Sequence, residues 1–188
     1  MRVLIAEDET LIRLDLRQLL ERADCDVCAE AHDGLEAVAL ARSEAPDLAI
    51  LDVKMPGLDG LEAARRILDE RPIPVLIVSA YTERALVERA VDIGVFGYLA
   101  KPFRDEDLLP AIAMARARFA ELSAVREEVE TLAEALAARK AIERAKGILM
   151  QKDSLTEDAA FARLRKASQM SGRPMRAIAE AVVDAFAV

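Results

Sequence analysis

Carboxylate side chains follow two apolar runs in the N-terminal part of the chain, at the point where each run ends. Glu7 and Asp8 come directly after the run at 3–6, and Asp52 comes directly after the run at 48–51. Three carboxylates that lie close together repel each other and call for a cation. Oxygen ligands select a hard divalent ion, most simply Mg²⁺, which accepts phosphate oxygens as well. With two acids holding the metal, a third carboxylate can act as a nucleophile toward a phosphoryl group.

Two further polar residues occupy the same kind of position. Ser79 ends the apolar run at 75–78, and Lys101 follows the run at 95–99. The Ser79 hydroxyl can donate to a phosphoryl oxygen, and the Lys101 ammonium supplies the positive charge that phosphoryl transfer requires. Each residue alone is equally compatible with an ordinary polar residue at a strand end. Five of them, at the ends of four of the five expected strands, favour a common site.

The elements that must position these residues alternate regularly. Apolar runs typical of buried strands lie at 3–6, 25–29, 48–51, 75–78 and 95–99, and helical patterns lie at 10–21, 34–43, 61–69, 83–93 and from Asp105 onward. This alternation predicts an α/β fold with a doubly wound, five-stranded parallel sheet, whose strand ends meet at one edge. No G-x-G-x-x-G or Walker motif follows the first strand, which argues against nucleotide folds of those kinds.

Composition limits the remaining classes. The chain has 188 residues and a formal net charge of -8, which argues against nonspecific nucleic-acid binding by the whole molecule. The charge is uneven, because residues 139–188 contain 10 Lys and Arg against 6 Asp and Glu. No apolar run is long enough to span a membrane, and the first strand begins too early for a signal peptide. We therefore expect a cytoplasmic protein.

The two cysteines form a C-x-x-C pattern, Cys25 and Cys28. Such a pair can be a redox couple or half of a zinc site. No second cysteine pair exists, and a strand at 25–29 would point the two thiols to opposite faces. We therefore interpret both as small packing or surface residues.

The helix that begins at Asp105 has no clear stop signal. Further along this helix, apolar residues recur at spacings of 3, 4, 3 and 4, at Leu122, Val125, Val129, Leu132 and Leu136. This is the a/d pattern of a coiled coil. It predicts either dimerisation through this helix or an amphipathic helix packed within its own chain. Three short helical segments follow, at 141–151, 156–170 and 174–186, which form at most a small core.

Residues 1–118 resemble the receiver domain of two-component response regulators, a flavodoxin-like fold. The resemblance covers Glu7-Asp8, Asp52 with Met55-Pro56-x-x-Asp59-Gly60, Ser79-Ala80, and Gly97-Tyr98 with Lys101-Pro102-Phe103. It implies a switch protein and not a metabolic enzyme. An enzyme of the phosphatase type that uses Asp52 would need an acid two residues later, where this chain has Lys54.

The receiver resemblance implies a role for each matching residue. Asp52 would be phosphorylated by a sensor histidine kinase. Mg²⁺ would be bound by Glu7, Asp8, Asp52 and the backbone carbonyl of Lys54. Lys101 and Ser79 would contact the phosphoryl group, Ser79 and Tyr98 would form the switch pair, and the Lys101–Pro102 peptide bond would be cis. Lys54 and Tyr81 occupy positions that tune phosphoryl lifetime in the family.

The C-terminal part resembles the ANTAR domain, the three-helix RNA-binding output of antitermination regulators. The resemblance rests on Ala-Lys-Gly-Ile-Leu-Met at 145–150 and Ala-x-x-x-Leu-Arg-x-x-Ser at 160–168. It implies a coiled-coil linker helix at 119–140, an ANTAR-like domain at 141–188, and binding to RNA hairpins in transcript leaders. Eight apolar or small residues are interpreted as packing residues: Ala141, Ala145, Gly147, Ile148, Leu149, Ala159, Phe161 and Leu164. Gly147 would permit close approach of another helix or of an RNA backbone.

Basic side chains are the candidates for RNA contact, because they bind phosphates and make affinity sensitive to salt. The candidates are Arg144, Lys146, Arg163, Arg165, Lys166 and Arg173. Each could equally belong to a solvated helix face. The alternative for the whole output is a helical protein-interaction module that does not bind nucleic acid.

Overall fold

The computed structural model describes residues 1–80 and 84–186, and of Asp105 only the backbone. The chain divides into two compact units, Met1–Ser123 and Ala124–Val188. Each unit has its own hydrophobic core and is described separately. Tyr81, one of the positions singled out above, lies outside the described residues.

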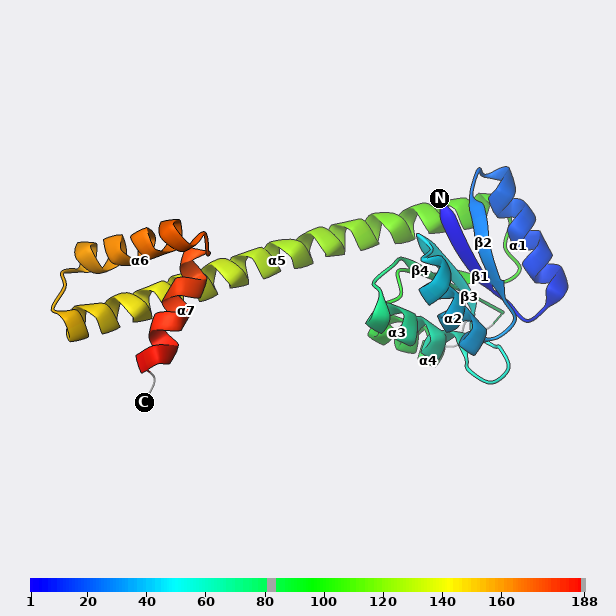
Figure 1. Ribbon diagram of the computed structural model, residues 1–188. Coiled ribbons are helices and arrows are strands. Elements are labelled where there is room, and N and C mark those ends of the chain that lie inside the picture. The colour runs from blue at the N-terminus through cyan, green and yellow to red at the C-terminus, as the bar shows by residue number, and fades with distance from the viewer. Residues whose placement is uncertain (81–83, 187–188) are drawn as a thin grey trace. The chain divides into compact units, whose positions relative to one another are not determined.

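The first unit contains a five-stranded parallel sheet with the order β2-β1-β3-β4-β5 (Figure 1). The strands are β1 (Arg2–Ala6), β2 (Asp26–Ala31), β3 (Leu48–Asp52), β4 (Val75–Ser79) and β5 (Gly97–Ala100). The order reverses between β1 and β3, as in doubly wound sheets that keep their sites beyond the carboxyl ends of the strands at this point. The predicted fold class is confirmed.

Helices connect the strands and cover both faces of the sheet. They are α1 (Thr10–Arg22), α2 (Gly34–Glu44), α3 (Gly60–Glu70), α4 (Arg84–Ile93) and the beginning of α5 (Asp105–Asp153). Asp33 and Asp59 cap α2 and α3, each accepting a hydrogen bond from the backbone N–H three residues later. Such caps satisfy backbone donors that the first helical turn leaves unpaired.

Alternation along the strands gives two apolar layers. Val3 and Ile5 of β1 face the layer that α1 and α5 cover, while Leu4 and Ala6 face the layer that α2, α3 and α4 cover. The central strands β3 and β4 are buried along their whole length. The polar residues at their carboxyl ends are therefore fixed to a rigid edge.

The helix α5 is continuous over 49 residues, so the linker at 119–140 and the first tail segment at 141–151 are parts of one helix. The helices α6 (Glu157–Ser171) and α7 (Met175–Phe186) follow. Thr156 caps α6, and Gly172 ends it with a positive φ of 68°. Gly172 adopts this left-handed conformation without the steric penalty of a side chain.

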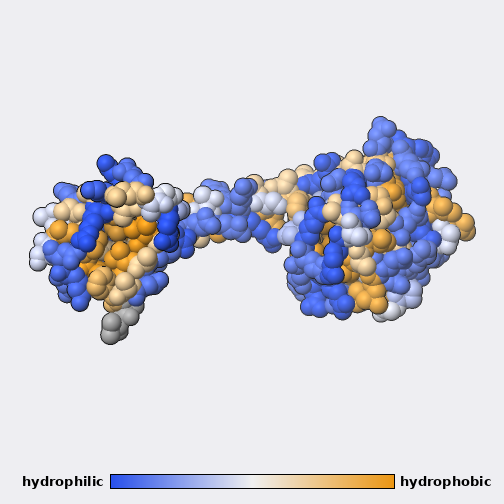
Figure 2. All heavy atoms as spheres, in the orientation of Figure 1, coloured by the Kyte–Doolittle hydropathy of each residue, from blue (hydrophilic) through white to orange (hydrophobic). Residues whose placement is uncertain are grey.

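The second unit has a small core made mostly of alanine and leucine. Its buried apolar members are Ala145, Leu149, Ala160, Leu164 and Ala179. Phe161 is 41% exposed, so its interpretation as a packing residue is wrong. Leu164, three residues later, takes the core position of α6. Hydrophilic side chains border an apolar area on the visible face of this unit (Figure 2).

No helix within the described part of the chain has both the length and the apolar character that a membrane span requires.

Candidate functional site

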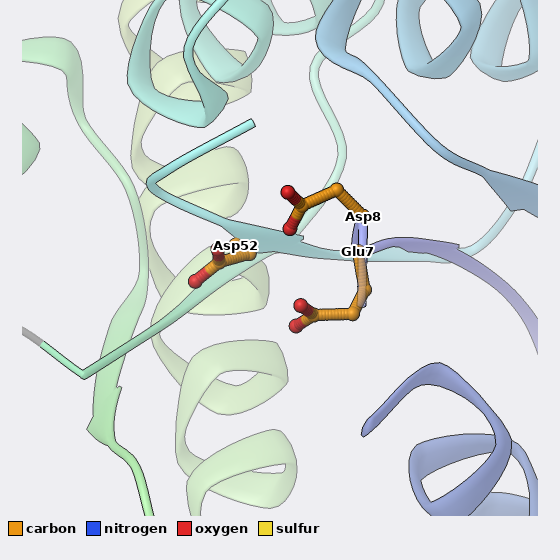
Figure 3. A group of neighbouring side chains, drawn as sticks. All are labelled: Glu7, Asp8 and Asp52. Carbon is orange, nitrogen blue, oxygen red and sulfur yellow. The ribbon is translucent and has the colours of Figure 1, made fainter. Parts of the chain in front are cut away.

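Three carboxylates converge at the carboxyl edge of the sheet (Figure 3). Glu7 and Asp8 leave the end of β1, and Asp52 is the last residue of the neighbouring strand β3. One oxygen from each lies within 4.8 Å of the others. Glu7 and Asp52 are buried, whereas Asp8 is exposed. This donor set fits a hard divalent cation such as Mg²⁺ that keeps part of its water shell.

Lys101 lies between two of these carboxylates. Its Nζ atom lies 2.5 Å from Oε2 of Glu7 and 3.1 Å from Oδ1 of Asp52. Burial raises the pKa of both carboxyls above their usual values, and the neighbouring Lys101 opposes this shift. Burial also disfavours the charged form of Lys101, but its hydrogen bond to Glu7 and the charge of Asp52 outweigh that effect and raise the pKa. One ammonium faces three carboxylates, so the site has capacity for further positive charge.

The backbone around Asp52 is held by close packing. The N–H of Gly60 donates to the carbonyl of Val53 at 2.9 Å. A Cβ atom at Gly60 would lie 1.8 Å from the carbonyl oxygen of Asp52, so only glycine allows α3 to start this close to the strand end. The backbone N–H of Lys101 donates to the carbonyl of Ser79 at 2.8 Å, and the Lys101–Pro102 peptide bond is cis.

Arg13 is a supporting residue that the sequence analysis did not identify. It is 6% exposed, and its guanidinium donates to the backbone carbonyl of Glu7 at 2.6 Å and lies 3.3 Å from a Glu30 carboxylate oxygen. It therefore ties the acidic turn after β1 to α1 and β2. A signal was present, because Arg13 shares the buried face of α1 with Leu16 and Leu20, and a buried arginine needs partners.

The remaining predicted receiver residues lie near this edge. Ser79 is fully buried at the end of β4, Lys54 is exposed, and Tyr98 is half-buried on β5. In the strand register, Tyr98 pairs with Ile77 and Ala100 pairs with Ser79. Ser79 and Tyr98 therefore lie on adjacent strands near the acidic cluster.

An open groove of about 690 Å³ begins at the acidic cluster. Its lining includes Asp8, Asp52, Lys54 and Lys101, together with side chains of α1 and Phe103. Asp52 is thus reachable although it is only 6% exposed. A small donor could enter the groove and bring a phosphorus atom to its carboxylate.

The predicted RNA-contact residues of the second unit separate into two groups. Lys146 is 8% exposed and pairs with Glu143 and Glu157, and Arg163 pairs with Asp153. The other candidates are exposed, and within the described part of the chain their side chains have no carboxylate partner; they are Arg144, Arg165, Lys166 and Arg173. The second group is free to meet an external anion.

Comparison with known families assigns both units. The response regulator receiver domain matches residues 3–113, and the ANTAR domain matches residues 130–183. The transcriptional regulatory protein PdtaR of Mycobacterium tuberculosis is 48% identical over 183 residues, covering 97% of this chain and 89% of PdtaR.

Solved structures resemble the first unit. The signal receiver domain of the response regulator NarL from Mycobacterium tuberculosis is 34% identical, with a TM-score of 0.57, over 60% of this chain and 92% of that one. A chain of the CheX-CheY-BeF3-Mg+2 complex from Borrelia burgdorferi is 25% identical, with a TM-score of 0.58, over 60% of this chain and 86% of that one. The chain belongs to the two-component response regulators, a family of regulators, and joins an N-terminal receiver domain to a C-terminal ANTAR output domain.

Proposed function

We propose that Asp52 accepts a phosphoryl group from a sensor histidine kinase. The observation that carries this proposal is the position of Asp52, which ends β3 at the mouth of an open groove with Lys101 3.1 Å away. A carboxylate oxygen of Asp52 attacks phosphorus, the bond between phosphorus and the kinase histidine breaks, and the imidazole leaves. Positioning and charge neutralisation account for most of the catalysis in such transfers.

Glu7, Asp8 and Asp52 would hold Mg²⁺, together with the backbone carbonyl of Lys54. When bound, the ion neutralises the phosphoryl oxygens. Lys101 contacts the same group and releases part of its pairing with Glu7, while the Ser79 hydroxyl donates to a phosphoryl oxygen. Ser79 and Tyr98 would form the switch pair that passes the phosphorylation state to the outer surface of β5.

The test of the acceptor is radiolabelling of the full chain with acetyl phosphate and Mg²⁺. Asp52→Asn abolishes the label, because the amide is not a nucleophile for this transfer. Asp69→Asn is the matched control, an exposed aspartate on α3 that should leave labelling unchanged. Label retained on Asp52→Asn would overturn the acceptor assignment.

The output is proposed to bind paired RNA hairpins and so to control transcription antitermination. Support comes from the exposed basic residues Arg144, Arg165, Lys166 and Arg173, which have no carboxylate partner within the described residues. We reassign Lys146 to a structural role, since its ammonium lies 2.6 Å from Glu157 and ties α6 to α5. Sequence-specific RNA readers usually target unpaired loop bases, which hairpins present.

We further propose that α5 forms a parallel homodimeric coiled coil. Its seam residues are 44–62% exposed and have no apolar cover within the described residues: Leu122, Val125, Val129, Leu132 and Leu136. With Leu122, Val129 and Leu136 at a positions and Val125 and Leu132 at d positions, Glu121 occupies a g position and Arg126 the e position five residues later. They can pair between chains only if the helices run parallel. Two output domains on one dimer fit two linked hairpins.

The test of the output uses RNA selected by the wild-type chain from a library of tandem stem-loops with randomised loops. Affinity of the selected RNA is then measured with and without acetyl phosphate. RNA binding that depends on phosphorylation supports both the RNA output and its control by Asp52. Equal binding in both states supports RNA binding but contradicts control by phosphorylation. Failure to select any RNA would favour the alternative, a protein-interaction output.

A further inference from the structure

Gly147, interpreted from the sequence as a packing residue, packs against nothing among the described residues of its own unit. It lies inside α5, where glycine is less favourable than alanine because it loses more backbone freedom on folding. A Cβ atom built at Gly147 would meet nothing within 4 Å, whereas one at Gly34 or Gly60 would collide with a backbone carbonyl. The fold of the described residues therefore gives no reason for a glycine at this position.

Gly147 belongs to a row of exposed residues along α5. The row consists of Lys140, Arg144, Gly147 and Gln151, at spacings of 4, 3 and 4 residues, which place them on one side of the helix. Ala145, in the core of this unit, lies two residues before Gly147, about 200° around the helix. The Gly147 row thus faces away from the packing surface for α6 and α7.

The positive charges of the row are not neutralised within the described part of the chain. The nearest carboxylate in sequence is Glu143, and its two oxygens both lie 3.0 Å from Lys146. A shallow hollow lies at the start of the row, lined by Lys140 and Arg144 together with Leu136, Arg139 and Glu143. Lys140 and Arg139 add positive charge that the earlier candidate set did not include.

We propose that the Gly147 row is where an RNA backbone approaches α5 most closely. This inference rests on the proposed RNA-binding function. Lys140 and Arg144 meet phosphates, the missing side chain at Gly147 lets the sugar-phosphate chain lie against the helix, and Gln151 donates to a phosphate or a 2′-hydroxyl. Glycine serves close backbone approach of this kind at other ligand sites.

A second copy of the helix could also use a glycine for close approach. The charge of the row argues against that occupant. In a symmetric pair of rows, Lys140 and Arg144 would face the same cations of the other chain, and like charges placed together oppose association. A polyanion removes this repulsion.

The experiment compares Gly147→Ala and Gly147→Leu with wild type in the full chain, using the RNA selected from the tandem stem-loop library. Alanine raises the midpoint of thermal unfolding, because it favours the helix, yet weakens RNA binding. Leucine weakens it further, by about tenfold or more, since it keeps the backbone at a distance. Ala181→Leu, at an exposed position of α7, is the steric control and leaves RNA affinity unchanged.

Charge is tested with Lys140→Gln and Arg144→Gln together. Loss of two phosphate contacts reduces the slope of log affinity against log salt by about 1.5. Arg176→Gln, which removes a cation already paired with Glu180, is the control.

The outcomes separate the two proposals. If wild type selects no RNA, the proposed function fails and this inference fails with it. If wild type binds RNA and Gly147→Leu binds it equally well, the proposed RNA-binding function is retained, but the proposal that RNA contacts the Gly147 row is contradicted. A change in self-association, measured by sedimentation, at unchanged RNA affinity would identify the row as a helix–helix contact and overturn the inference.

Discussion

The ammonium of Lys101 lies 2.5 Å from Oε2 of Glu7, whose side chain is 1% exposed. Lys101→Ala would leave that carboxylate buried without a cation, so we expect the free energy of unfolding to fall by about 3 kcal/mol in the absence of Mg²⁺. Urea titration followed by tyrosine fluorescence measures this in the receiver, because Tyr81 and Tyr98 are the only tyrosines and the chain has no tryptophan.

Arg104→Ala is the control for that measurement, because its pair with Glu106 is largely exposed. Exposed pairs of this kind contribute at most about 1 kcal/mol. A Lys101→Ala receiver as stable as Arg104→Ala would show that Lys101 does not neutralise Glu7.

Mg²⁺ is expected to stabilise the receiver through the acidic cluster. A ligand that binds only the folded state adds about 1.4 kcal/mol at ten times its Kd. Asp8→Asn abolishes most of this gain and leaves the metal-free protein intact, since Asp8 is exposed. Glu9→Gln, the neighbouring exposed acid, retains it. Equal Mg²⁺-induced shifts in the midpoint of thermal unfolding for both variants would exclude Asp8 as a ligand.

The receiver site was predictable because it depends on strand order. Each of the five expected residues follows an apolar run, and parallel strands bring such ends to one edge. The sequence could therefore place Glu7, Asp52 and Lys101 together without any side-chain detail. Arg13 was missed because a single arginine on an amphipathic helix is usually a solvated residue, and its buried contact with the Glu7 carbonyl depends on how α1 packs.

The second unit was less predictable because its pairings depend on the approach of one helix to another. Lys146 and Glu157 are 11 residues apart across a turn, and no helical periodicity indicates that they meet. Phe161 was interpreted as a packing residue, but Ala160 and Leu164 already complete the α6 side of a core made of small residues. Basic composition alone could not separate paired from unpaired cations.

The Lys146–Glu157 pair predicts a pH dependence of tail stability. The hydrogen bond from Lys146 lowers the pKa of Glu157, and the hydrogen bonds to Glu157 and Glu143 raise the pKa of Lys146. Because the pKa of Glu157 is lower in the folded chain than its usual 4.5, the unfolded chain binds more protons between these two pKa values. The stabilisation from the pair is therefore complete above pH 4.5 and is lost as the pH falls through the folded-state pKa of Glu157. Because the pKa of Lys146 is raised in the folded chain, the stabilisation is also lost when the pH rises through the folded-state pKa of Lys146.

Circular dichroism melts of the full chain measure this effect. The difference in melting midpoint between wild type and Glu157→Gln should be present at neutral pH and disappear as the pH falls below 4.5 and through the lowered pKa of Glu157. Asp158→Asn is the matched control, because both acids lie in the first turn of α6 and share its helix dipole. A difference that persists unchanged in acid would mean that the ion pair does not contribute.

Phe161 is expected to contact RNA directly. It is 41% exposed on α6, one turn before the exposed Arg165, and an aromatic beside a cation offers a stacking surface for an unpaired base. Such stacking contributes ~1–3 kcal/mol per base, so Phe161→Ala should weaken binding of the selected RNA by about tenfold or more, while Phe161→Tyr retains it. Met170→Ala, at an 80% exposed position of the same helix, controls for lost apolar surface. Unchanged RNA affinity for Phe161→Ala would contradict a stacking role for Phe161.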